Sequence, residues 1–144
     1  PYGEGFGSGV TAEAFPHEVT LSDDTPLRGC VAAWLNVPNR RGREEGQRSW
    51  FRTAEATRIA RETKKVVADH PHLSVGIITF YAAQRDRIFS ELARVGLTEL
   101  DDQGGYRVRD QWRRTVDGRE RLRIGTVDAF EALACILKYN VLDR

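Results

Sequence analysis

The chain has few of the features that mark membrane, secreted or metal-binding proteins. Its 144 residues include two cysteines, Cys30 and Cys135, which are far apart and belong to no Cys-x-x-Cys or Cys/His cluster. We interpret both as reduced, buried hydrophobic residues rather than as a disulfide or a metal site. No apolar run approaches the ~18 residues of a membrane-spanning helix, and no signal-peptide pattern opens the sequence. The sequence therefore predicts a cytoplasmic, intracellular protein without membrane contact.

The charge balance is nearly neutral. A net charge of +1 gives no overall basic field that would by itself indicate nucleic acid. Hydrophobic residues make up 40% and charged residues 30% of the chain, as in a globular domain with a core. Only three of the 22 basic residues are lysines, and the arginines cluster at 40–43, 85–87 and 107–123. Arginine suits bidentate phosphate recognition, although a codon bias toward arginine explains the same clusters.

The first half of the chain contains one clear helical pattern. Residues 1–29 are rich in Gly, Ser, Thr, Asp and Pro and predict an irregular lead-in. The apolar run Cys30–Val37 predicts a short buried strand. Ser49–His70 predicts a helix, because its apolar residues recur every three to four positions, with Ser49 or Thr53 as N-cap.

The second half alternates strand and helix. Ser74–Phe80 is a continuous β-branched run typical of a central parallel strand. A helix is expected over Ala82–Val95, and Leu122–Gly125 predicts another strand. Asp117-Gly118 predicts the turn of a hairpin within residues 106–124. This order predicts an α/β layered domain with a mainly parallel sheet and helices on both faces.

Three blocks of the sequence carry a resemblance to a known family. They are Ser49–Ala56, Gly76–Gln84 and Ile124–Phe130. In this order they resemble the patterns S-x-x-N-x-x-E-A, G-I-I-T-P-Y-x-x-Q and V-G-T-V-D-x-F of the second RecA-like domain of superfamily 1 DNA/RNA helicases, of the type of the nonsense-mediated-decay helicase and its bacterial relatives. The resemblance implies a RecA-like, P-loop-NTPase-like three-layer domain over 30–144, as part of a larger protein.

The resemblance also implies a function. The domain would be the C-terminal motor half of an ATP-dependent helicase. It would bind single-stranded DNA or RNA and complete a site for ATP and Mg²⁺ with an N-terminal RecA-like domain. No Gly is followed by Lys in the 144 residues, so the phosphate-binding loop G-x-x-x-x-G-K-[ST] does not occur in them. We therefore expect these residues alone to be inactive in ATP hydrolysis and to hold no cofactor tightly.

The resemblance assigns nucleic-acid contacts to the ends of two strands. Thr79, Tyr81, Thr126 and Asp128 fall on matching motif positions, and hydroxyl and backbone N–H groups at a strand end suit a nucleic-acid phosphate. For Asp128 we favour a role in fixing its loop by accepting backbone N–H bonds. Phe80 stacks on a base or packs in the core, and we favour packing because the family commonly has Pro there.

The resemblance assigns nucleotide contacts to Arg52, Gln84 and Glu131. Arg52 lies one position from an Arg that reaches the γ-phosphate in many members. Gln84 begins a helix, where N–H groups favour anions, and a helix-capping amide is the alternative. Glu131 opens a segment, Glu131–Ala134, that departs from the family's Gln-Gly-x-Glu. Truncation, missing residues and a degenerate site all explain this departure. No catalytic residue is assigned.

Two other functions stay open. The first is a non-catalytic RecA-like module that binds nucleic acid or protein. The second is a metal-dependent nuclease built on Glu62 and Lys64, although these residues fall in a predicted helix without a clear acidic partner. His70 and His72 have no further clustered ligands, so no metal site is assigned.

Overall fold

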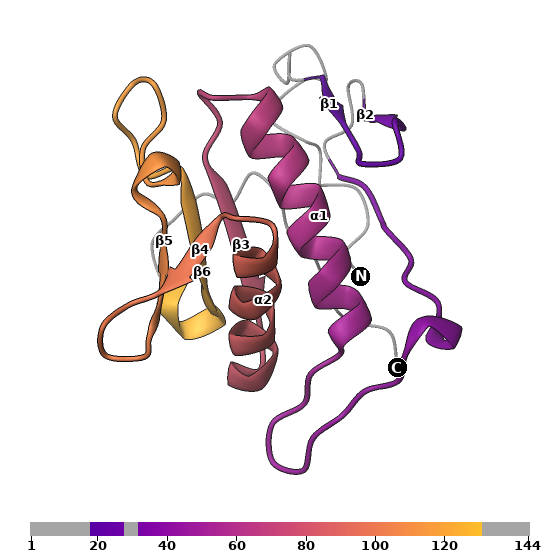
Figure 1. Cartoon of the computed structure of the whole chain (residues 1–144). Helices are drawn as coiled ribbons and strands as arrows, with labels where there is room; N and C mark the ends of the chain where they lie inside the picture. The colour runs from indigo at the N-terminus through magenta and orange to yellow at the C-terminus, as the bar shows by residue number, and fades with distance from the viewer. Residues whose placement is uncertain (1–17, 28–31, 131–144) are drawn as a thin grey trace, which may run out of the picture.

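A computed structural model describes residues 18–27 and 32–130 (Figure 1). Cys30, Cys135 and Glu131 lie outside the described residues. The strands and helices are β1 (Val19–Thr20), β2 (Pro26–Leu27), α1 (Thr53–Asp69), β3 (Val75–Thr79), α2 (Ala82–Arg94), β4 (Thr98–Leu100), β5 (Tyr106–Val108) and β6 (Leu122–Thr126). Short 3₁₀ turns are η2 (Asn39–Arg41), η3 (Asp110–Trp112) and η4 (Val127–Phe130).

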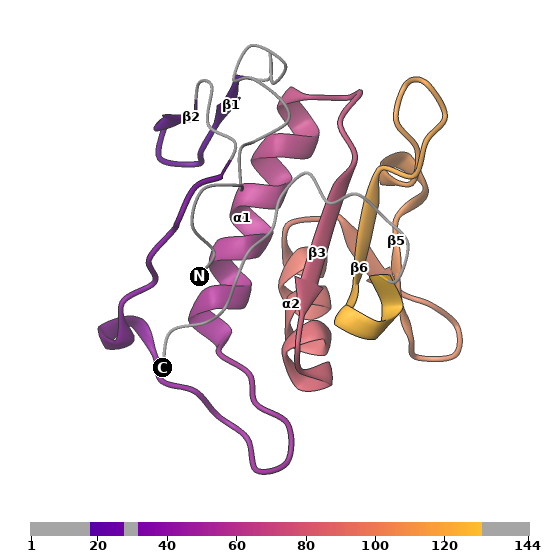
Figure 2. The same ribbon diagram turned by 180° about the vertical axis from the view of Figure 1, so that it is seen from behind.

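The centre of the fold is a parallel pair of strands, β3 and β6, which lie side by side in Figure 2. Val75 pairs with Leu122 at one end and Thr79 with Thr126 at the other. Both strands were predicted from their apolar runs, and their parallel pairing confirms the α/β class. α2 and the antiparallel β4–β5 hairpin lie between them in sequence.

The helices α1 and α2 pack against each other and join β3 in one apolar core. Ile88 and Leu92 of α2 are fully buried, as is Ile77 of β3. Burial of an aliphatic side chain of this size stabilises a fold by about 1.5–3 kcal/mol. The predicted end of the second helix is also confirmed, because Gly96 follows α2 in a left-handed conformation (φ 78°) that favours glycine.

The start of α1 differs from the prediction. The helix begins at Thr53, with Arg52 at the N-cap position and no side-chain cap of its own. Neither predicted cap residue caps this helix. The Ser49 hydroxyl instead accepts a hydrogen bond from the Ala83 N–H at 3.0 Å, at the start of α2. An unpaired N–H group in the first turn of a helix needs such an acceptor.

The predicted strand at Cys30–Val37 is wrong for the part that the structure describes. Residues 32–37 form no ladder with any described strand. Trp34, in the middle of the run, is 61% exposed. An apolar run becomes a buried strand only where a neighbouring strand pairs with its backbone, and here that neighbour is lacking among the described residues.

The predicted hairpin around Asp117-Gly118 is reduced to a turn. Only one bridge, between Arg114 and Glu120, flanks it. β5 pairs instead with β4, across a loop that contains Gly104 (φ 77°). The turn η3 interrupts the chain after β5 and prevents one long strand up to residue 116.

Part of the predicted irregular lead-in is a small hairpin. β1 and β2 pair antiparallel, and Leu21 between them is buried. The carboxylate of Glu62 on α1 accepts hydrogen bonds from the Ser22 N–H at 2.7 Å and from the Ser22 hydroxyl at 2.6 Å. These bonds attach residues 18–27 to α1. In the part of the chain that the structure describes, no helix has the length and apolar character to span a membrane.

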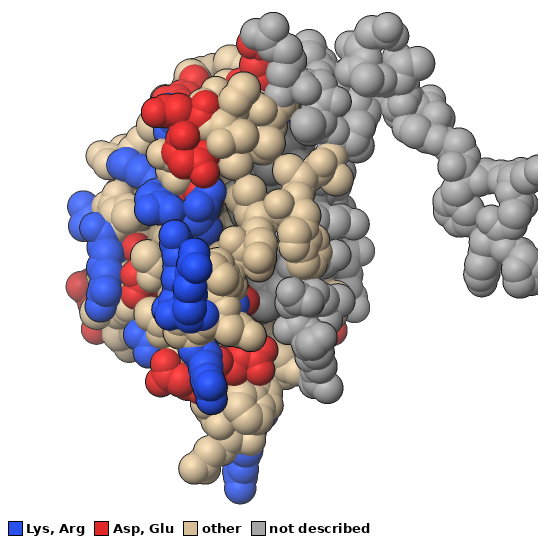
Figure 3. Space-filling view, turned by 90° about the vertical axis from the view of Figure 1, so that its right-hand side faces the viewer, with Lys and Arg blue, Asp and Glu red and all other residues tan. Residues whose placement is uncertain are grey.

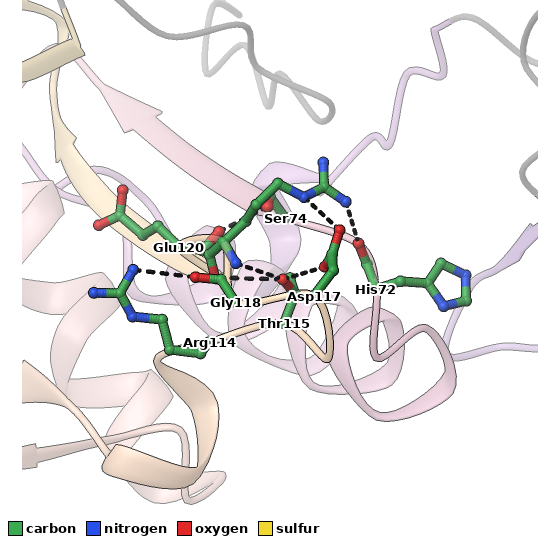
Figure 4. Close-up of polar contacts among 8 residues, drawn as sticks. His72, Ser74, Arg114, Thr115, Asp117, Gly118 and Glu120 are labelled. Atoms are coloured by element: carbon green, nitrogen blue, oxygen red, sulfur yellow. Dashed lines mark hydrogen bonds and ion pairs between the residues drawn. The ribbon is translucent and has the colours of Figure 1, made fainter.

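The turn before β6 fixes the register of the parallel pair (Figure 4). The Thr115 hydroxyl donates to Asp117 Oδ1 at 2.5 Å and accepts the Arg119 N–H at 3.0 Å. The Ser74 hydroxyl donates to the Glu120 carbonyl at 2.7 Å, just before β3 and β6 begin. Strands aligned at their amino ends also end together, so this network helps to place Thr79 beside Thr126.

Candidate functional site

The carboxyl ends of β3 and β6 meet at one edge of the sheet. Thr79 and Thr126 are register partners there. Exposed side chains follow both of them: Phe80 is 57%, Tyr81 40% and Val127 45% exposed. The structure thus brings together the residues that the sequence assigned to nucleic acid. In an open α/β sheet, ligands bind beyond the carboxyl ends of the strands.

Phe80 corrects one expectation. Packing in the core was favoured for this side chain, but more than half of its surface is exposed. The reason lies in the alternation of β3, because Thr79 faces inward and is only 4% exposed. The next side chain faces outward, and the chain turns into α2 before anything covers it.

The hydroxyl of Thr79 has a local partner. It accepts the Tyr81 N–H at 3.5 Å, at the N-cap position of α2. Asp128 is exposed, and its carboxylate receives no hydrogen bond from another described residue. The loop-fixing role favoured for Asp128 is therefore not seen among the described residues.

Arg52 and Gln84, both assigned to the nucleotide side, contact each other. The Arg52 N–H donates to Gln84 Oε1 at 2.7 Å. The guanidinium of Arg52 donates to the Gly42 carbonyl at 2.7 Å, the Pro38 carbonyl at 2.8 Å and the Glu55 carboxylate at 2.8 Å. Arg52 is 7% and Gln84 2% exposed. Contact between this guanidinium and a phosphate would require it to release at least one of these partners.

The amide of Gln84 acts as a cap, but for the other helix. Its Oε1 satisfies an N–H at the start of α1, while Gln84 itself lies in the first turn of α2. Its Nε2 is buried without a hydrogen-bond partner among the described residues. The helix-capping role of the amide is thus confirmed, but the capped N–H belongs to α1 and not to the helix that contains Gln84. The sequence could not show that the N–H comes from Arg52, because the two residues are 32 positions apart.

Two helix N-termini open at the same edge. α1 and α2 both begin at the end of the molecule where β3 and β6 finish, at the bottom of Figure 1. Each N-terminus carries the equivalent of about half a positive charge and free N–H groups, which favour anions. The edge therefore combines hydroxyl groups, exposed aromatic rings and anion-favouring helix ends.

A comparison with known families agrees with this arrangement. A family model described as "AAA domain" matches residues 6–132. The chain belongs to this AAA domain family. The match begins inside the predicted lead-in and ends just beyond η4. No curated protein and no solved structure matches the chain significantly.

This AAA domain is the helicase type, found in superfamily 1 helicases. The superfamily resemblance is thereby confirmed at this level. AAA domains of this type are helicase-like P-loop NTPase domains, which agrees with the parallel sheet and helices described above.

The residues of the nuclease alternative are occupied by structural contacts. The Glu62 carboxylate binds Ser22 and also pairs with the Arg58 guanidinium at 2.5 Å. Lys64 lies over the Trp112 ring, 4.5 Å from its centroid. Glu62 and Lys64 therefore have different partners and share no site. No group of three or more His, Cys, Asp or Glu side chains within 18–27 and 32–130 has the geometry to hold a metal ion.

Proposed function

We propose that this chain is the second, C-terminal RecA-like motor domain of an ATP-dependent superfamily 1 DNA/RNA helicase, of the type of the nonsense-mediated-decay helicase. It binds single-stranded DNA or RNA across the carboxyl edge of the β3–β6 pair. With an N-terminal RecA-like domain it completes the ATP site. Closing and opening of the two domains around ATP drives movement along the strand.

The observation that carries the proposal is the pairing of Thr79 with Thr126 at the strand ends. The exposed residues Phe80 and Tyr81 follow Thr79 directly. In the proposal the Thr126 hydroxyl donates a hydrogen bond to a backbone phosphate, as hydroxyl groups commonly do in nucleic-acid complexes. The aromatic rings offer faces on which bases of any identity stack. Asp128 lies exposed in the turn that follows Thr126.

On the nucleotide side the proposal uses Arg52, Gln84 and Glu131. An arginine from this domain would stabilise charge on the transferred phosphoryl group. For Arg52 this requires exchange of a carbonyl or carboxylate partner for phosphate when the domains close. The described residues offer no ligand cluster for Mg²⁺. In the proposal Mg²⁺ enters together with ATP.

The test is a pair of substitutions at Thr126 in the protein that contains both domains. Thr126→Ala should weaken single-strand binding and uncouple ATP hydrolysis from unwinding, because the hydroxyl at the strand end is lost. Thr126→Ser keeps the hydroxyl and should retain both activities. Binding is measured by fluorescence anisotropy and unwinding by strand displacement. An alanine variant with unchanged affinity and unwinding would contradict the proposal.

A second candidate is a RecA-like module that binds nucleic acid without using nucleotide. The burial of Arg52 and Gln84 in internal contacts favours it. Calorimetric titration of the two-domain protein with ATP separates the candidates. ATP binding that is weakened by Arg52→Ala supports the motor, whereas absence of ATP binding supports the module.

A further inference from the structure

The segment of residues 38–50, here called the basic loop, concentrates unpaired positive charge. It carries four arginines and two glutamates, and all six side chains are exposed: Arg40, Arg41, Arg43, Arg48, Glu44 and Glu45. None of these arginines forms an ion pair with another described residue. Most described arginines elsewhere are paired with acids, among them Arg58, Arg85, Arg107, Arg113 and Arg119.

Figure 3 shows where the basic side chains gather. They form a band down the side of the molecule that holds α1 and the segment before it, and basic atoms appear again at the lowest tip, below a stretch of uncharged residues. Acidic side chains lie at the upper end and also beside the lower part of the band. With four arginines against two glutamates, the basic loop carries a net positive charge, which favours a polyanion.

The backbone of the basic loop is held in place by internal bonds. Arg52 clamps its first part by donating to the carbonyls of Pro38 and Gly42. Glu45 and Phe51 exchange two backbone hydrogen bonds of 2.8 and 2.9 Å, which close the remainder. Gly46 (φ 130°) makes the tight turn between them, where a Cβ would lie 2.2 Å from the Ser49 carbonyl oxygen. A loop ordered before binding loses less conformational entropy when a ligand arrives.

The basic loop adjoins the carboxyl edge of the sheet. Ser49 near its end caps α2, directly after the exposed residues Phe80 and Tyr81. The Phe51 ring lies 4.8 Å from the Arg87 guanidinium of α2. Trp50 between these two anchors is 41% exposed. Cations and an aromatic ring therefore continue the surface on which the single strand is proposed to lie.

We propose that the basic loop is a second nucleic-acid contact, distinct from the strand ends. Arg40, Arg41, Arg43 and Arg48 bind backbone phosphates, and Trp50 stacks on a base. Such a surface adds salt-dependent, sequence-independent affinity. The proposal goes beyond the motor function, because it requires neither ATP nor a second domain.

The test uses the 144-residue chain and a fluorescently labelled single-stranded oligonucleotide, with affinity measured over a series of salt concentrations. The loop variant is Arg40→Gln/Arg41→Gln/Arg43→Gln. Arg94→Gln/Arg107→Gln/Arg113→Gln is the control, with the same change in net charge elsewhere on the surface. Loss of three phosphate contacts should lower the slope of log affinity against log salt by about 2. The control should keep the slope of the wild type.

Trp50→Leu gives an independent reading. Loss of one stacked base should weaken binding by about tenfold or more while the salt slope stays constant. All these side chains are exposed, so circular dichroism and thermal unfolding should match the wild type. A Trp50 variant with wild-type affinity removes the stacking part of the proposal.

Two results would overturn the assignment. One is a wild-type chain that binds no oligonucleotide at low salt, and the other is an equal loss in the loop and control variants. If Thr126→Ala weakens binding and the loop variant does not, the basic-loop proposal fails while the strand-end proposal stands.

Discussion

The backbone N–H of Arg52 donates a 2.7 Å hydrogen bond to the side-chain oxygen of Gln84, and this bond joins the starts of α1 and α2. Both residues are buried. Replacing Gln84 by Met removes the acceptor at nearly constant volume and leaves a buried N–H unpaired. We expect the free energy of unfolding to fall by about 1–3 kcal/mol, measured by urea denaturation.

The control for this prediction is Gln111→Met on the exposed turn η3, which should change stability by no more than about 0.5 kcal/mol. Equal stability of the Gln84 and Gln111 variants would show that the bond between the helix starts contributes nothing.

Arg52 also fixes the basic loop, and this can be tested separately from nucleotide binding. A lysine at this position cannot reproduce the fork that reaches Pro38, Gly42 and Glu55 together. Arg52→Lys should cost about 2 kcal/mol of stability. Trypsin should also cut more quickly after the loop arginines, which mass spectrometry of the early fragments would locate.

Arg61→Lys is the matched control for Arg52→Lys, because Arg61 is exposed on α1 and has no ion pair with a described residue. Trypsin should cleave the loop of the Arg61 variant at the same rate as that of the wild type. If the Arg52 variant also keeps the wild-type cleavage pattern, the clamp does not order the loop.

The sequence predicted the elements whose signal is local. Continuous β-branched residues predicted β3, and apolar residues at helical spacing predicted α1 and α2. Thr79 and Thr126 are the last residues of these two strands and therefore lie at one edge. These features depend on neighbours within a few residues, and such neighbours are visible in a sequence.

The features that the sequence did not predict depend on distant partners. Ser49 looked like a cap for its own helix, but its hydroxyl caps α2, 34 positions away. Asp117-Gly118 suggested a hairpin turn, but β5 pairs with β4, and only one bridge flanks residues 117 and 118. Trp34 looked like a core residue, although no described strand pairs with its segment.

Acid should loosen the turn that aligns β3 and β6. Hydrogen bonds from the Thr115 hydroxyl, and then from Arg119, hold the pKa of Asp117 below its ordinary value of 3.8. Because the pKa is lower in the folded state, the ionised carboxylate of Asp117 contributes to stability above pH 3.8, its ordinary value. The contribution is lost as the pH falls through the folded pKa. Below pH 3.8 the wild type should therefore lose thermal stability more steeply than Asp117→Asn.

The measurement for Asp117 is the melting temperature as a function of pH, with Asp102→Asn as the control because Asp102 is exposed and forms no hydrogen bond with a described residue. The control should follow the wild-type curve. Parallel curves for the wild type and the Asp117 variant would show that this turn does not respond to acid.

The exposure of Phe80 predicts that this side chain affects binding without affecting the fold. The ring is 57% exposed beside Thr79, so Phe80→Leu should change stability by no more than about 0.5 kcal/mol. Loss of one stacking face should weaken single-strand binding by about 1–3 kcal/mol, measured by fluorescence anisotropy. Trp34→Leu is the control, because Trp34 has a similar exposure of 61% and belongs to residues 32–37, which pair with no described strand. A larger loss of affinity in the Trp34 variant than in the Phe80 variant would show that the single-stranded nucleic acid does not bind at the ends of β3 and β6.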